Sequence, residues 1–289
     1  MSAIHSMTGY AACNVSLPGA TLGIELRSVN SRFLDIHFRL PDELRPSETV
    51  LREAINGALG RGKVDCRATV TGTSPGLQSA MNPEALASLK TVLGAIGKEF
   101  PEVRPAGVGD ILRWPGLFGD SGPDFAACNA AMKPLVGQCL TELKACRARE
   151  GAQLAAALRE RLAAMRQIIT DIAPMIPAAH AAFETKIRQR LLDALGSAED
   201  ERIRQEIVIY ATRVDVAEEV SRLNAHIDET ERVIAKGGTA GKRLDFLMQE
   251  FNREANTLGS KSVSGDVSAA AMELKILIEQ MREQVQNIE

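Results

Sequence analysis

The sequence predicts an α+β fold, in which an N-terminal, mostly antiparallel sheet with helices precedes a long all-helical C-terminal region. Two observations carry this prediction. Apolar and polar residues alternate over 21–27 and again over 33–40, as they do in strands that bury one face. From about residue 125 the composition shifts to helix formers, with apolar residues at helical spacing. We therefore divide the chain into two domains, residues 1–124 and residues 125–289.

The first domain is expected to hold a small sheet and two helices. The strands are predicted over 4–15, 21–27, 33–40 and 63–71, and the helices over 47–59 and from Pro83 to about residue 98. The strands over 21–27 and 33–40 are expected to form a hairpin-like pair with one polar face. Ser47 is the expected N-cap of the first helix, and Pro83 suits the first position of the second. The Pro- and Gly-rich stretch 101–124 is predicted to be an extended loop or a short helix with a loop.

The second domain is predicted as a series of helices separated by Pro and Gly, over 130–171, 178–195, 200–235, 241–259 and 266–288. The first of them is either one long helix or two helices broken near Gly151. The last carries apolar residues in alternating steps of four and three, at Val267, Ala271, Leu274, Ile278, Met281, Val285 and Ile288. This heptad seam needs a partner helix, which lies either in the same chain or in another subunit.

Composition limits the possible partners. The chain has 289 residues, of which 45% are hydrophobic and 25% charged, as is usual for a globular protein. Its formal net charge of −3 gives no overall basic character. Nucleic acid would therefore have to bind at a local basic patch or through metal ions.

The cysteines and the chain start indicate the compartment. There are five cysteines and no CxxC pair, so a zinc site or a disulfide framework is not expected. The first ten residues lack a basic segment and an apolar segment, and no apolar run approaches the length of a membrane span. We expect a cytoplasmic protein with reduced thiols and no contact with a membrane.

The segment 241–261 has the strongest pattern in the chain. Leu244, Met248, Phe251, Ala255 and Leu258 form one apolar stripe of a helix. Asp245 follows one flank of this stripe together with amide side chains, whereas Glu250 and Glu254 lie one turn apart on the other flank. Such groups bind metal ions, sugars or phosphates through fixed geometry. The alternative is a polar helix that faces a partner through hydrogen-bonded amides.

The helix over 200–235 carries a second polar strip. Asp215, Glu219, Arg222 and His226 follow one another at helical spacing beside an apolar stripe. Two carboxylates and an imidazole can bind a divalent cation or supply acid and base groups. A ladder of salt bridges on a solvated face is the better interpretation of this helix alone. If the two helices pack antiparallel, His226 and Glu219 could face Asp245, Glu250 or Glu254.

The first domain also offers groups that could hold phosphates. These are Arg27, Asn30 and Arg32 around a strand turn, and Arg61 and Lys63 in a Gly-flanked loop. Between residues 27 and 67 there are eight basic and six acidic residues, an excess of only two.

Several motifs, in the same order along the chain, resemble the bacterial YicC/YloC family. They are Ser6-Met-Thr-Gly-Tyr10, Glu25-Leu-Arg-Ser-Val-Asn30, Arg61-Gly-Lys63, Glu218-Glu-Val-Ser-Arg-Leu223, the run 242–262, and the closing Arg282-Glu-Gln-Val-Gln-Asn-Ile-Glu289. Two departures occur, at Ala11 and at Asn224-Ala225, and neither affects a carboxylate.

The resemblance implies an endoribonuclease that cuts single-stranded or loop RNA, requires a divalent metal ion such as Mg²⁺ or Mn²⁺, and acts in RNA turnover, including that of small regulatory RNAs. It also implies a ring-like homo-oligomer, a hexamer, and other RNA-degradation proteins are possible partners. The candidate catalytic residues are Glu219, His226, Glu250 and Glu254, and these four with Asp245 are the candidate metal ligands. Arg222, Lys242, Arg243 and Arg253 would neutralise phosphate charge, and the basic residues of the first domain would grip RNA elsewhere.

Three alternatives stay open. The site could work without metal, with His226 as the base. The chain could instead be a non-catalytic, oligomeric RNA-binding adaptor for another ribonuclease. It could also be a helical scaffold held together by the seam over 267–288. Scarce aromatic residues, at 4%, argue against recognition by base stacking, so binding should depend on backbone charge and fall with salt.

Overall fold

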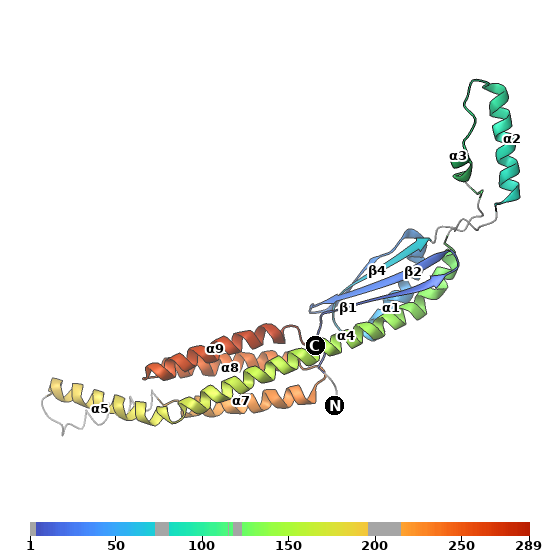
Figure 1. Cartoon of the computed structure of the whole chain (residues 1–289). Helices are drawn as coiled ribbons and strands as arrows, with labels where there is room; N and C mark the ends of the chain where they lie inside the picture. Colours follow the sequence, from blue (N-terminus) through green and yellow to red (C-terminus); the bar gives the residue numbers. More distant parts are fainter. Residues whose placement is uncertain (1–3, 73–80, 115, 118–122, 196–214) are drawn as a thin grey trace.

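A computed structural model describes residues 4–72, 81–114, 116–117, 123–195 and 215–289. Figure 1 shows an elongated molecule in which a sheet and a helical bundle lie at opposite ends of one long helix. That helix is α4 (Phe125–Ile172), and its residues belong to both hydrophobic cores. The predicted order of a sheet region and then a helical region is confirmed.

The sheet has four strands in the order β1-β2-β4-β3. These are β1 (Gly9–Leu17), β2 (Ala20–Val29), β3 (Leu34–Arg39) and β4 (Gly62–Gly72). β2 pairs antiparallel with β1 and with β4, whereas β3 pairs with β4 in parallel. The predicted hairpin of 21–27 with 33–40 is therefore wrong, because β4 lies between these two strands. Alternation shows which face of a strand is buried, but it does not identify the neighbouring strand.

One face of the sheet packs against helices. Leu22, Ile24 and Leu26 of β2 are fully buried in one core together with residues of α4 and α1 (Glu48–Ala58). A 3-10 turn, η1 (Asp42–Ser47), leads into α1, so Ser47 does precede the helix. Its hydroxyl donates to the Oδ1 of Asn129 on α4, at 2.5 Å, and does not cap α1. The serine thus joins the two helices that cover the sheet.

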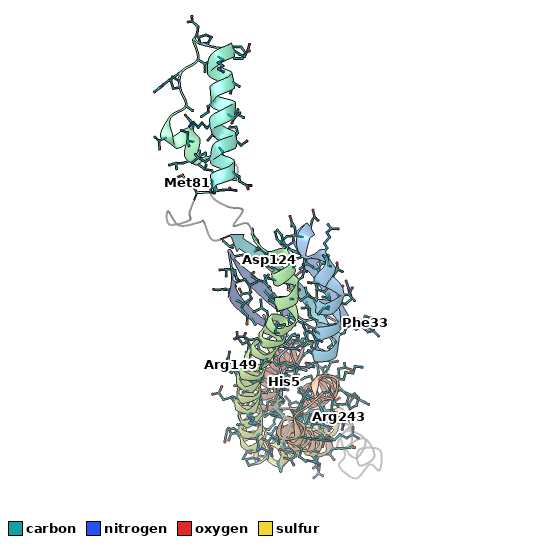
Figure 2. All side chains as sticks on the ribbon, turned by 90° about the vertical axis from the view of Figure 1, so that its right-hand side faces the viewer. His5, Phe33, Met81, Asp124, Arg149 and Arg243 are labelled. Atoms are coloured by element: carbon teal, nitrogen blue, oxygen red, sulfur yellow. The ribbon has the colours of Figure 1, made fainter. Side chains whose placement is uncertain are left out.

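Two further helices lie apart from the sheet, as Figures 1 and 2 show. They are α2 (Pro83–Glu99) and the short α3 (Val108–Leu112). Asn82 caps α2, since its Oδ1 accepts from the backbone N–H groups of Glu84 and Ala85. Pro83 occupies the first helical position, where a missing N–H costs nothing.

The long helix α4 is continuous, so the chain does not break near Gly151. A Cβ on Gly151 would clash with the carbonyl oxygen of Ile4, so the glycine permits close approach of the N-terminal segment. The next helix, α5 (Met175–Leu195), begins three residues earlier than predicted. Pro177 is tolerated there because the first N–H groups of a helix have no partner within it.

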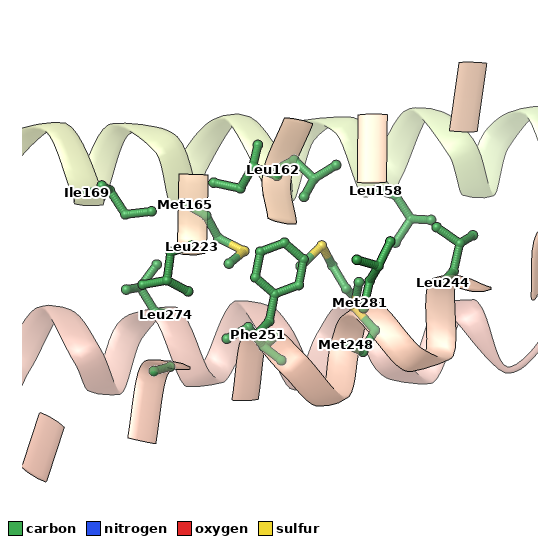
Figure 3. Packing of buried hydrophobic residues seen from close by; sticks show 14 of the residues in the cluster. Leu158, Leu162, Met165, Ile169, Leu223, Leu244, Met248, Phe251, Leu274 and Met281 are labelled. Atoms are coloured by element: carbon green, nitrogen blue, oxygen red, sulfur yellow. The ribbon is translucent and has the colours of Figure 1, made fainter. Parts of the chain in front are cut away.

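The C-terminal bundle consists of α7 (Ala217–Lys236), α8 (Gly241–Lys261) and α9 (Gly265–Val285) packed against α4. The part of the predicted helix 200–235 before residue 215 lies outside the described residues. The core of the bundle is shown in Figure 3, where Phe251 and Met248 of α8 meet Leu162 and Met165 of α4. The heptad seam of α9 is buried in this core, so its partner helices lie within the chain.

The two chain ends meet where the sheet joins the bundle. Ser6 forms a β-bridge with Ile288, and the N–H of Met7 donates to the carbonyl of Asn287 at 2.8 Å. Arg147 of α4 is 2% exposed, and its guanidinium donates to the carbonyl of Ser6 and to the carboxylate of Glu289 at 2.7 Å. Burial lowers the pKa of Arg147, and the facing Glu289 opposes that effect. This junction fixes the bundle relative to the sheet.

Within the described part of the chain, no helix is both long enough and apolar enough to cross a membrane.

Candidate metal centre between two helices

The candidate centre lies where α7 packs beside α8. A short connection joins the helices, with Gly237 and Gly238 at φ values of 66° and 78° that favour glycine. The predicted apolar stripe of α8 is buried along its whole length. Burial of this stripe turns the flank that carries Glu250 and Glu254 toward α7, where His226 projects.

His226, Glu250 and Glu254 form one cluster. Each offers a ligand atom, and these atoms lie within 4.8 Å of one another. Glu254 is only 3% exposed, and the other two side chains are half-buried. The His226 ring meets Phe251 edge to face, with centroids 5.8 Å apart. Its Nε2 atom is buried and has no hydrogen-bond partner among the described residues.

Arg222 closes one side of the cluster. Its Nη1 donates to the Oε1 of Glu254 at 3.3 Å, and its Nη2 donates to Glu218. The hydrogen bonds to Glu254 and Glu218 raise the pKa of Arg222. The guanidinium is half-exposed, so it compensates the buried carboxylate and still presents positive charge to solvent.

The cluster fits a divalent cation. Carboxylate oxygens suit Mg²⁺ and Mn²⁺, and imidazole nitrogen is a common ligand for transition metals. A buried ring nitrogen without a partner costs free energy unless some ligand satisfies it. Two carboxylates gathered beside that nitrogen provide the negative charge that a cation needs. The same groups could also act in acid–base chemistry, as His226 and a carboxylate would without metal.

The other predicted ligands lie elsewhere. Glu219 is 5% exposed and accepts from the Nζ of Lys261 at 2.8 Å, which raises the pKa of Lys261. It precedes His226 by two helical turns, and its Oε2 atom is also buried without a partner in the described chain. Asp245 lies on the opposite flank of α8, where it accepts from Gln249 at 3.1 Å. Neither residue belongs to the cluster of His226.

The basic residues predicted on the bundle have different surroundings. Lys242 and Arg253 are exposed on α8. Arg243 pairs with Glu229 at 3.1 Å and lies over the ring of Phe246. All three lie on α8, the helix that also carries Glu250 and Glu254.

Two of the residues predicted to bind RNA in the first domain serve the junction. The side chain of Asn30 donates to the carbonyl of Gln286, and Arg61 donates to the carbonyl of Ile288, both at 2.7 Å. Arg27 and Lys63 are exposed on strands, and Arg32 lies over the ring of Phe33. Arg61 and Lys242 also line a pocket of about 330 Å³ at the start of α8.

Sequence reasoning missed Arg147, the buried residue that ties α4 to both chain ends. The sequence does indicate that Arg147 is buried, because this residue lies four positions after Leu143 and four before Gly151 on the buried stripe of α4. A charged residue on a buried stripe implies a specific polar partner. The partners could not be named, because they come from the two ends of the chain.

Fold and site together define the class: an α+β module joined by one long helix to a helical bundle that carries a histidine–carboxylate cluster. The family models described as endoribonuclease YicC-like, N-terminal region and C-terminal, match residues 4–156 and 172–289. A protein of Haemophilus influenzae named probable endoribonuclease YicC is 36% identical over 99% of this chain and 100% of its own length. A protein of Clostridioides difficile with the same name is 28% identical over 98% of this chain and 99% of its own. The chain belongs to the YicC-like endoribonuclease family.

Proposed function

We propose that this chain is a divalent-metal-dependent endoribonuclease that cleaves phosphodiester bonds in single-stranded or loop RNA. The family supports the ribonuclease activity, and one observation supports its location. The Nε2 of His226, which has no hydrogen-bond partner in the described part of the chain, lies with the carboxylates of Glu250 and Glu254, and the half-exposed Arg222 contacts Glu254. We further propose that the enzyme is cytoplasmic, acts in RNA turnover including that of small regulatory RNAs, and works as a homo-oligomer, a hexamer.

In this proposal His226, Glu250 and Glu254 hold Mg²⁺ or Mn²⁺. The bound ion would polarise the scissile phosphate and lower the pKa of the attacking oxygen. Arg222 keeps its positive charge beside Glu254 and can donate to a phosphate oxygen from its exposed edge. Arg253, Lys242 and Arg243 extend positive charge along α8 to hold the RNA backbone. Glu219 orients Lys261 through its hydrogen bond, which supports a positioning role for this carboxylate.

The test is cleavage of a labelled, structured RNA by the purified protein in EDTA, Mg²⁺ or Mn²⁺. The Glu250→Gln/Glu254→Gln variant should bind RNA and fail to cut it in every condition. The matched control is Glu273→Gln/Glu283→Gln, which makes the same charge change at two exposed positions of α9 and should cut like the wild type. Equal cutting by the wild type and the first variant would refute this location of the site.

RNA binding without cleavage, in the wild type and in both variants, would refute the enzyme and support the alternative of a non-catalytic RNA-binding adaptor. Cleavage by the wild type that persists in EDTA and needs His226 would instead support the metal-free mechanism.

A further inference from the structure

The open face of the sheet carries a group of side chains that the candidate metal centre does not use. One face of the sheet packs on α4 and α1, and the strands alternate, so every second residue points away from that core. On this open face the register places Tyr10 opposite Arg27, Arg27 opposite Asp65, and Arg67 opposite both Glu25 and Arg39. Residues from all four strands therefore meet on one surface.

Three arginines on this face have no ion-pair partner among the described residues. Arg27, Arg67 and Arg39 come from β2, β4 and β3, and all three are exposed. Glu25 and Asp65 lie among them, yet no carboxylate oxygen of the described chain comes within 4.0 Å of a nitrogen of these arginines. Arg39 and Arg67 are direct neighbours in the parallel pair. Like charges directly opposite each other destabilise a sheet, and an anion bound between Arg39 and Arg67 would relieve their repulsion.

A tyrosine completes the group. Tyr10 on β1 is 55% exposed, although large aromatic side chains are usually well covered. It borders a hollow of about 240 Å³ that is also lined by Glu25, Arg27, Arg39, Asp65 and Arg67. An exposed aromatic ring beside guanidinium groups is the combination that binds unpaired bases and their phosphates.

We propose that this open sheet face binds single-stranded RNA, with phosphates on Arg27, Arg39 and Arg67 and one base stacked on Tyr10. Aromatic residues are scarce in the chain as a whole, so stacking is assigned to this one exposed ring and the rest of the affinity to backbone charge. The inference rests on the proposed function in that it takes RNA as the substrate. It assigns binding to a surface outside the bundle, so a strand held here is positioned by the sheet and cut elsewhere. Stacking requires a base free of its pairing partner, and a duplex would present only its backbone to this face. Single-stranded RNA is therefore the preferred ligand over double-stranded RNA.

The first test is binding of a labelled single-stranded oligoribonucleotide in EDTA, measured over a series of salt concentrations. Arg39→Gln/Arg67→Gln should weaken binding at low salt and reduce the slope of log affinity against log salt by about 1.4, which is about 0.7 for each phosphate that is no longer neutralised. The control, Arg149→Gln/Arg159→Gln, changes two exposed arginines of α4 and should keep the wild-type slope. An unchanged slope in the first variant, with an unchanged melting temperature, would overturn the proposal.

The second test separates stacking from charge. Tyr10→Ala should weaken single-strand binding about tenfold, whereas Tyr10→Phe should preserve it, because any aromatic ring can stack on a base. Neither change should affect the affinity for a duplex of the same length. Equal affinity of Tyr10→Ala and wild type for the single strand would show that Tyr10 takes no part in binding.

These outcomes are distinct from failure of the proposed function. Wild-type protein that binds single strands through this face but never cuts RNA would leave the binding surface intact and refute the nuclease. If the Arg39→Gln/Arg67→Gln and Tyr10→Ala variants still cut RNA and bind single strands with unaltered affinity, the nuclease stands and the binding surface is refuted.

Discussion

Binding of Mn²⁺ by the metal-free protein should raise its melting temperature, and this rise should depend on Glu250. A ligand that binds only the folded state, at a hundred times its dissociation constant, stabilises that state by about 2.7 kcal/mol. For a chain of this size each kcal/mol corresponds to about 2 °C, so the expected rise is about 5 °C. We expect Mn²⁺ to bind at the cluster, because ligand atoms of His226, Glu250 and Glu254 lie within 4.8 Å of one another there.

Two variants make the prediction specific to this geometry. Glu250→Gln removes one charged ligand from a half-buried position, so the rise should fall to about 1 °C or less at the same Mn²⁺ concentration. Asp245→Asn makes the same chemical change on the same helix, five residues earlier. Asp245 lies about 140° around α8 from Glu250 and accepts from Gln249, so its variant should keep the full rise.

Differential scanning fluorimetry with and without Mn²⁺ measures both effects, and circular dichroism checks that the variants fold. An equal rise in Glu250→Gln and wild type would refute the cluster as the binding site. Loss of the rise in Asp245→Asn would show that the ligand set is the broader one that the sequence predicts. A rise in neither the wild type nor the variants would refute metal binding at this cluster and would leave the metal-free mechanism, with His226 as the base.

Three further outcomes follow from packing and from thiol pKa values. Gly151→Ala should lower the melting temperature, because its Cβ would clash with the Ile4 carbonyl oxygen. In the control Gly137→Ala, on the same helix, the new Cβ meets nothing within 4 Å, so this variant should stabilise the folded protein by about 0.5–1 kcal/mol. Phe251→Ala should cost about 3–5 kcal/mol in urea unfolding, because the ring is fully buried in the bundle core, and a cost below about 1 kcal/mol would contradict that packing. Burial raises the pKa of the Cys66 thiol to about 12. In the native protein at pH 8 this thiol should therefore resist alkylation, whereas the half-buried Cys146 should react. Mass spectrometry of the alkylated protein measures both. Since the raised pKa disfavours the thiolate only in the folded state, the stability from Cys66 is complete below its unfolded pKa near 9 and is lost as pH rises toward 12.

The site was predictable from the sequence to the extent that helical spacing determines it. Burial of Leu244, Met248 and Phe251 places Glu250 on a fixed flank of α8, and the same rule places His226 on α7. Spacing gave several possible ligands, because any polar residue beside an apolar stripe could face the neighbouring helix. The packing of α7 on α8 brings His226 to Glu250 and Glu254, and leaves Glu219 with Lys261.

The sequence by itself determined the elements of this protein, and the tertiary structure decided their neighbours. Alternation and helical periodicity are local properties, so strands such as 34–39 and the stripe of α8 could be read directly. The insertion of β4 between β2 and β3, and the meeting of Ser6 with Ile288 at Arg147, join residues far apart in the chain. Such contacts depend on burial of the whole surface and on hydrogen-bond partners supplied by distant segments, which no local pattern records.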